Sequence, residues 1–121
     1  MNNQKNIVLC GVGVQGTVLA SKLLAAAAMS KDIPVMSAET IGMAQRGGSV
    51  FSHLRMGNDL YSPMIETGTA DLIIGFEPGE TVRMLPYLKT GGHVVVRWNR
   101  SVPVSRSLIM AVYLLPAQPK N

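Results

Sequence analysis

The sequence predicts an α/β protein: a three-layer, Rossmann-like domain with a mainly parallel sheet and a hairpin insertion. Short apolar runs that end at glycines or turn residues, as expected of buried strands, alternate along the chain with stretches of helical periodicity. Residues 49–56 instead alternate between the two faces of a strand and are followed by Gly57, Asn58 and Asp59, which are turn residues and predict a hairpin. A chain of 121 residues has room for one domain, so residues 1–121 are treated as a single unit.

The expected elements follow one another in the order of a wound α/β fold. Strands are expected over residues 6–10, 35–38, 49–56, 70–76 and 93–98, and helices over 17–29 and 80–88. The first strand, helix and second strand form a βαβ unit with a right-handed crossover. Residues 60–65 are the candidate hairpin partner of 49–56, although Pro63 suits only an edge strand. Residues 101–121 show no clear element that closes the sheet, so we expect an arm, an edge strand or a C-terminally shortened domain.

Composition and charge exclude several classes of protein. The formal net charge is +4, but the basic residues are scattered and aromatic residues make up only 5%, so we expect no nucleic acid as a partner. No apolar segment has the length of a membrane span or the pattern of a signal peptide, so we expect no membrane partner and a cytoplasmic location. Hydrophobic residues make up 47% and charged residues 15%, which favours a surface covered by a partner or by self-association of the isolated chain. A sheet buried on both faces would explain the same composition.

Cys10 is the only cysteine, and one thiol makes no internal disulfide, zinc site or iron–sulfur cluster. Its apolar neighbours predict a small buried side chain. His53 is expected to be a hydrogen-bonded core or interface residue, and His93 only begins a strand. We therefore predict no catalytic residue and no metal ligand on this chain.

The first glycine-rich motif lies between a predicted strand and a predicted helix. Gly11, Gly13 and Gly16 have the spacing of a dinucleotide-binding turn, in which backbone N–H groups and a helix N-terminus face a phosphate. Gln15 lies within the turn, and Glu39 follows the second strand, where a ribose-binding acid would fall. The alternative is that the glycines only allow close packing of strand and helix. The motif alone supports a stand-alone nucleotide-binding protein or an NAD-dependent dehydrogenase.

The second glycine-rich motif follows the second predicted strand and is expected to be a loop. Its candidate binding residues are Gln45, Arg46, Gly47, Gly48 and Ser49. A guanidinium beside paired glycines presents a fixed cation and several backbone donors to an anion. Two alternatives stay open: an ion pair with a carboxylate on another subunit, and a solvated surface loop.

Several segments together carry a resemblance to one family. They are GVGVQG (11–16), TVLASKLLA (17–25), ETIGMAQRGGSVFSHLRMG (39–57), YSPMI (61–65), ADLIIGFEP (70–78) and LPYLKTGGHVVV (85–96). They resemble the gamma-type subunit or domain of the 2-oxoacid:ferredoxin oxidoreductases, and within it the small (beta) subunits of the indolepyruvate-type enzymes. The stretch MAQRGGSV (43–50) is the most specific part. The chain departs from the family at Val14, where a glycine is usual, and over residues 101–121, which match poorly.

The resemblance implies a non-autonomous subunit. In such complexes a 2-oxoacid, coenzyme A as co-substrate and oxidised ferredoxin give an acyl-CoA, carbon dioxide and reduced ferredoxin. Thiamine diphosphate, Mg²⁺ and the iron–sulfur clusters are then expected on a large partner subunit, since this chain has one cysteine and no thiamine diphosphate motif. The glycine turn and the Arg46 loop are where this chain would touch the partner's cofactor or coenzyme A. A purely structural module is a third interpretation.

Overall fold

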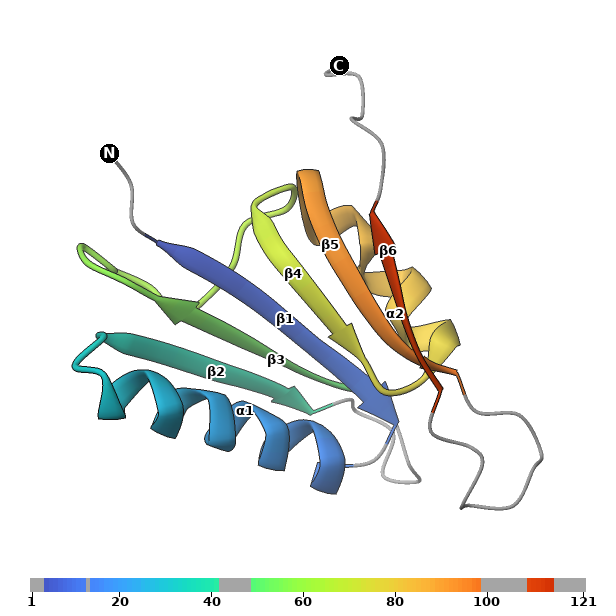
Figure 1. The fold of residues 1–121 in the computed structure, drawn as a ribbon, viewed down its shortest axis with the longest axis horizontal. Coiled ribbons are helices and arrows are strands. Elements are labelled where there is room, and N and C mark those ends of the chain that lie inside the picture. The colour runs from blue at the N-terminus through green and yellow to red at the C-terminus, as the bar shows by residue number, and fades with distance from the viewer. Residues whose placement is uncertain (1–3, 13, 42–48, 99–108, 115–121) are drawn as a thin grey trace.

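The computed structural model describes residues 4–12, 14–41, 49–98 and 109–114 (Figure 1). It contains two α-helices, a short 3₁₀ helix and a six-stranded sheet with the order β2-β3-β1-β4-β5-β6. The helices are α1 (Val14–Ser30), α2 (Pro78–Met84) and the 3₁₀ helix η1 (Leu85–Tyr87). The strands are β1 (Lys5–Val12), β2 (Val35–Ile41), β3 (Ser49–Met56), β4 (Ala70–Gly75), β5 (Leu88–Trp98) and β6 (Ile109–Leu114).

The sheet is mixed, and this corrects part of the expectation. β1 pairs in parallel with β4, and β4 with β5, but β3 is antiparallel to both β1 and β2, and β6 is antiparallel to β5. The hairpin exists, but its two strands are β2 and β3; residues 60–65 form no strand. Ser52, His53 and Leu54 are fully buried, so β3 needs neighbours on both edges and both faces. It therefore lies inside the sheet, between the two strands of the βαβ unit.

Helices cover both faces of the sheet, which confirms the three-layer arrangement (Figure 1). Side chains alternate along β1: Ile7 and Leu9 belong to the core beneath α1, while Val8 and Cys10 belong to the core beneath α2 and η1. A strand that is apolar on both faces is the expected signature of a sheet enclosed in this way. Cys10 is buried, as predicted.

The second helix begins and ends at residues that the sequence marks. The Glu77 carboxylate accepts hydrogen bonds from the backbone N–H groups of Gly79 (2.9 Å) and Glu80 (3.0 Å), and Pro78 occupies the first helical turn. The α-helix ends at Met84, and Pro86 lies in the 3₁₀ helix that follows. Among the residues that the structure describes, no helix is both long and apolar enough to cross a membrane.

His53 anchors the segment that connects β3 to β4. Its Nδ1 accepts a hydrogen bond from the backbone N–H of Ile65 at 2.8 Å, so the neutral ring carries its proton on Nε2. The ring also packs edge-on against Tyr87, with centroids 5.4 Å apart. Arg55, on the same face, donates to the Ser62 carbonyl at 2.8 Å. The prediction of a hydrogen-bonded core histidine is thus confirmed.

This histidine predicts a pH-dependent stability. Burial lowers the pKa of His53, so folding favours its neutral form. The contribution of His53 to the free energy of unfolding is complete above the unfolded pKa, about 6.5, and is lost as the pH falls below it, by at most about 1.4 kcal/mol per pH unit. Urea unfolding between pH 7.5 and 5 measures this slope. His53→Asn keeps an acceptor for Ile65 without titrating and should flatten the slope. An equal slope in this variant and in the parent protein would contradict the assignment.

Candidate functional site

The candidate site lies at the edge of the sheet where β1, β2, β4 and β5 end. Val12 is opposite Ser49 and Ile41 is opposite Val50, so the end of β2, the start of β3 and the end of β1 meet at this edge. Between β1 and β4 the chain leaves the sheet toward opposite faces, into α1 on one side and α2 on the other (Figure 1). In open α/β sheets such a switch point is where ligands bind.

Gly11 is required by packing. A Cβ added at Gly11 would lie 2.9 Å from the Thr17 Oγ1 and 3.2 Å from the Phe76 Cβ. Thr17 is in the first turns of α1 and is buried, so it has little room to move. For this glycine, close approach of strand and helix is a sufficient explanation.

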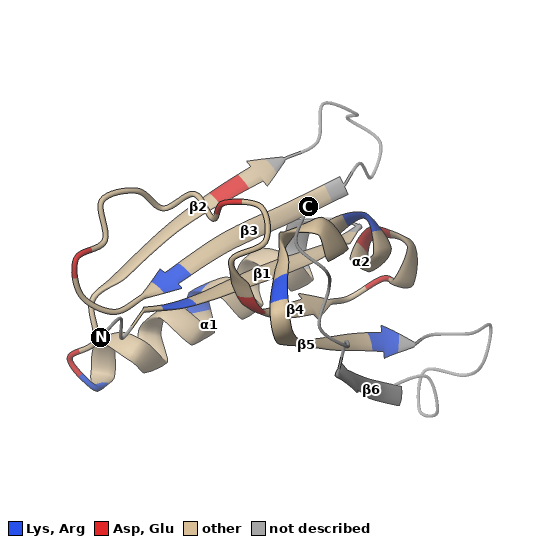
Figure 2. Cartoon of the chain, turned by 90° about the horizontal axis from the view of Figure 1, so that it is seen from above, with Lys and Arg blue, Asp and Glu red and all other residues tan. Residues whose placement is uncertain are grey.

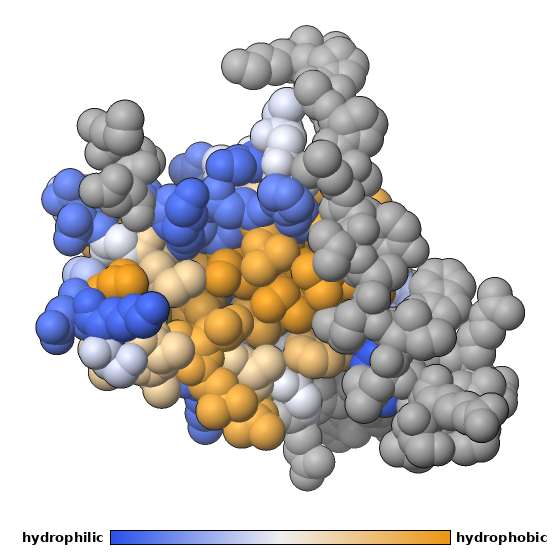
Figure 3. All heavy atoms as spheres, in the orientation of Figure 1, coloured by the Kyte–Doolittle hydropathy of each residue, from blue (hydrophilic) through white to orange (hydrophobic). Residues whose placement is uncertain are grey.

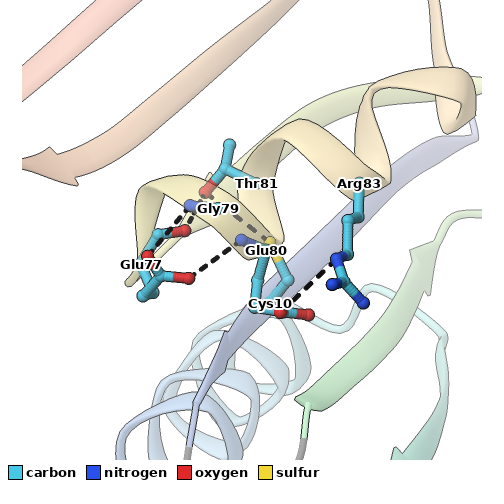
Figure 4. A network of polar contacts seen from close by, with 6 residues as sticks. All are labelled: Cys10, Glu77, Gly79, Glu80, Thr81 and Arg83. Atoms are coloured by element: carbon cyan, nitrogen blue, oxygen red, sulfur yellow. Dashed lines mark hydrogen bonds and ion pairs between the residues drawn. The ribbon is translucent and has the colours of Figure 1, made fainter.

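The β4–α2 connection repeats this arrangement. Gly75 precedes Thr81 by six residues, just as Gly11 precedes Thr17, and a Cβ at Gly75 would overlap the Thr81 side chain. The Thr81 hydroxyl donates to the Glu77 carbonyl at 2.7 Å and accepts a weak hydrogen bond from the Cys10 Sγ at 3.9 Å (Figure 4). Sequence reasoning missed this pair, although the repeated pattern of Gly, five residues and Thr-Val was a readable signal.

Gly16 is different from Gly11. Among the residues that the structure describes, a Cβ at Gly16 would meet no atom within 4 Å, so packing against the described residues does not explain this glycine. Gly16 is exposed in the first turn of α1, at the candidate edge. Gly13 lies outside the described residues, and of Gln15 the structure describes only its place in α1. Of the two glycines of this turn that the structure describes, Gly11 is explained by its contacts with described residues and Gly16 is not.

Glu39 does not join the glycine turn. It lies exposed on β2, where Figure 2 shows the acidic segment in red. Its partner on β3 is Ser52. Because β3 separates β2 from β1, Glu39 is displaced by two strand spacings, about 10 Å, from the strand that leads into the turn. A dinucleotide site of the usual kind places its acid on the strand beside the first one. The geometry therefore does not favour the stand-alone dehydrogenase.

The Arg46 loop is fixed at both ends to the same edge. Gln45, Arg46, Gly47 and Gly48 lie outside the described residues, and Ser49 begins β3. The strands on either side hold the loop's two ends at the edge where the glycine turn begins. The described residues that flank the two motifs, Val12, Ile41 and Ser49, thus lie at one end of the sheet.

The two sides of this edge differ in charge. On the α2 side, the Glu77 carboxylate occupies the first N–H groups of the helix, and Glu80 forms an ion pair with Arg83 at 3.8 Å (Figures 2 and 4). The first turn of α1 carries no acidic residue. An anion is therefore better accommodated beside α1 than beside α2.

Neither a cluster nor a metal fits the described residues. Burial raises the pKa of the Cys10 thiol to about 11, so it stays protonated and is a poor nucleophile and iron ligand. No group of three or more His, Cys, Asp or Glu side chains that would hold a metal ion occurs in the described ranges.

Comparison with known proteins now identifies the family. The family described as pyruvate ferredoxin/flavodoxin oxidoreductase matches residues 6–119. The chain belongs to this family. It is 44% identical over 108 residues to the indolepyruvate oxidoreductase subunit IorB of Pyrococcus horikoshii. The match covers 89% of this chain and 54% of that protein. The chain therefore spans about half the length of the curated relatives that it matches.

Solved structures share the fold. The gamma subunit of a keto/oxoacid ferredoxin oxidoreductase from Geobacter sulfurreducens matches with a TM-score of 0.59 at 24% identity, over 76% of this chain and 50% of that one. The 2-oxoglutarate:ferredoxin oxidoreductase of Magnetococcus marinus, solved with 2-oxoglutarate, coenzyme A and succinyl-CoA, matches with a TM-score of 0.69 at 19% identity, over 86% of this chain and 19% of that one. These likenesses show that the chain shares its fold with these oxidoreductase structures.

Proposed function

We propose that this chain is the gamma-type domain of the small subunit of a 2-oxoacid:ferredoxin oxidoreductase. Its family and its relatives named as indolepyruvate oxidoreductase subunits support indolepyruvate or another aryl pyruvate as the substrate. In the complex, the 2-oxoacid is oxidatively decarboxylated to an acyl-CoA, and the electrons pass to ferredoxin. The chain takes part as a non-autonomous subunit in the cytoplasm.

The residues of this chain support a division of labour between subunits. The one cysteine is buried and protonated, so these 121 residues do not provide the thiolates of an iron–sulfur cluster. The described part of the chain likewise offers no acidic cluster for Mg²⁺ and thiamine diphosphate. We therefore place the clusters, Mg²⁺ and thiamine diphosphate on a large partner subunit. This chain would complete the active site or hold the assembly together.

One observation carries the proposal: the glycine turn and the two ends of the Arg46 loop meet at the switch-point edge, where Gly16 keeps open space in front of α1. Gly11, Gly13, Gln15 and Gly16 would approach coenzyme A or the partner's cofactor from one side, and residues 45–49 from the other. A coenzyme A diphosphate suits this position, because the first turn of α1 is free of acidic residues.

Gly16→Ala separates function from folding. The change should raise the free energy of unfolding by roughly 0.5–1 kcal/mol, because alanine favours a helix and no atom of the described residues obstructs the new methyl group. In the assembled enzyme it should raise the Michaelis constant for coenzyme A, because the methyl group occupies the space in front of the turn. The matched control is Ala27→Ser, a change of similar size at another small exposed residue of α1, far from the glycine turn. An unchanged Michaelis constant in Gly16→Ala would mean that no ligand approaches here.

A further inference from the structure

Helix α1 has apolar residues on the side that faces solvent. Its inner side packs on the sheet through the buried residues Thr17, Ser21 and Ala28. Its outer side exposes Leu19 and Leu23, by 58% and 62%. Lys22 is the single charged residue among the 17 of this helix. A helix that is apolar all round is normally buried on both sides.

The exposed residues form a regular line. Those on the outer side beyond the glycine turn follow one another at alternating spacings of four and three, and all are exposed: Leu19, Leu23, Ala26 and Ser30. We call this line the α1 seam. Alternation of three and four is the spacing by which one helix packs along another in a coiled coil. The two leucines are followed by two small residues, Ala26 and Ser30, so a second helix would meet projecting side chains at one end of the line and could approach closely at the other.

The surface around the α1 seam is also apolar. Leu72 and Ile74 of β4 and Phe76 just after it point to the face of the sheet that carries α1, and they are only half-buried. Figure 3 shows apolar side chains gathered over this part of the face. The seam thus continues into a wider apolar area rather than ending in a polar surface.

Charge indicates which partner fits. Lys22 flanks the α1 seam, α1 contains no acidic residue, and within the described ranges Lys22 forms no ion pair. A second copy of this chain packed α1 against α1 would place an apolar residue or another Lys22 opposite Lys22, since α1 carries no carboxylate. A helix of another protein, with an aliphatic face and an acidic residue beside it, would match both the apolar seam and the charge of Lys22.

We propose that the α1 seam is a docking site for a helix of the partner subunit, with an aliphatic heptad face and a carboxylate opposite Lys22. This inference rests on the proposed function, because it assigns the surface that binds the partner subunit. When the isolated chain self-associates, a second copy would bind to the same surface, but with a lower affinity than the partner helix.

Paired substitutions test the site in the complex formed with the large subunit. Leu19→Gln combined with Leu23→Gln should weaken the affinity between subunits at least tenfold, because both side chains are desolvated on docking. The fold should persist, since both side chains are more than half exposed in the chain alone. The matched control is Val82→Gln, which alters a 63%-exposed aliphatic residue of α2 on the opposite face of the sheet. Equal affinities for the double variant and the control would overturn the proposal.

A zero-length carbodiimide cross-linker, applied to the purified native complex, tests the predicted carboxylate directly. We expect Lys22 to be joined to an Asp or Glu on a helix of the large subunit. Lys31, which is exposed just beyond α1, should not show this cross-link. Cross-links from Lys22 to another copy of this chain would overturn the proposal. So would a Lys22 amine that an acylating reagent modifies as fast in the complex as in the free chain.

The same complex distinguishes this inference from the proposed function. A complex that oxidises 2-oxoacids while Lys22 stays fully reactive refutes the docking site alone. A complex with the expected cross-link but without 2-oxoacid oxidation refutes the proposed function and leaves the docking site in place.

Discussion

Gly75→Ala should lower the free energy of unfolding by about 3 kcal/mol, the upper range for overpacking a tight core. The new methyl carbon would overlap the Thr81 Oγ1 and lie 2.8 Å and 2.9 Å from its Cβ and Cγ2. Thr81 is held in place by its hydrogen bond to the Glu77 carbonyl and by burial against the sheet. Relief therefore requires α2 to move away from β4, which also disturbs the core around Cys10.

Gly11 and Gly16 provide controls of graded severity for Gly75→Ala. Gly11→Ala meets its nearest obstacle at 2.9 Å, without the overlap found at Gly75, and should destabilise less. Gly16→Ala meets no obstacle among the described residues and should stabilise. Urea unfolding of the three variants measures the order directly. If Gly75→Ala is as stable as the parent chain, the close contact between β4 and α2 is wrong.

Arg46→Ala should have the largest effect on function. If this guanidinium binds coenzyme A or a carboxylate of the partner in a buried site, its removal should cost about 2–5 kcal/mol of binding free energy. The stability of the isolated chain should change by less than about 0.5 kcal/mol, because a loop arginine adds little to a core. Two measurements on the reconstituted complex separate the two roles. A lower affinity between the subunits assigns Arg46 to the interface, and a higher Michaelis constant for coenzyme A assigns it to that ligand.

Two further variants sharpen this experiment. Arg46→Lys keeps the charge but not the planar fork, so a bidentate contact with a phosphate or carboxylate should remain weakened. Arg83→Ala removes an arginine on α2 whose side chain is 72% exposed, and should leave both measurements unchanged. If neither affinity nor Michaelis constant responds to Arg46→Ala, the loop is a solvated connection.

Local sequence patterns were sufficient for most of the fold. Runs such as residues 6–10 are apolar on both faces of a strand, and this predicted an enclosed sheet. The neighbours of β3 could not be predicted in this way, because periodicity gives a strand its faces but not its partners. The prediction paired residues 49–56 with 60–65 on closeness in sequence. The structure instead pairs β3 with β1 and β2, since full burial of His53 and Leu54 requires an interior position.

The candidate site was predicted in part. The sequence indicated that the glycine turn matters, but the packing role of Gly11 and the open space at Gly16 depend on where Thr17 and Phe76 lie. Glu39 lies at the right distance along the chain for a ribose contact. The sequence does not show that β3 is inserted between β2 and β1, which places Glu39 too far from the glycine turn. The seam of α1 was readable from spacing, yet its exposure follows from which side of the helix the sheet covers.

The central claim is that this chain is an obligatory but non-autonomous subunit of a 2-oxoacid:ferredoxin oxidoreductase. The direct measurement is reduction of ferredoxin that depends on indolepyruvate and coenzyme A, with iron analysis of the same samples. We expect the purified chain to contain no iron and to show no turnover, the large subunit alone to contain iron but turn over poorly, and the two together to restore the rate. Turnover by this chain alone, or a full rate from the large subunit without it, would contradict the account.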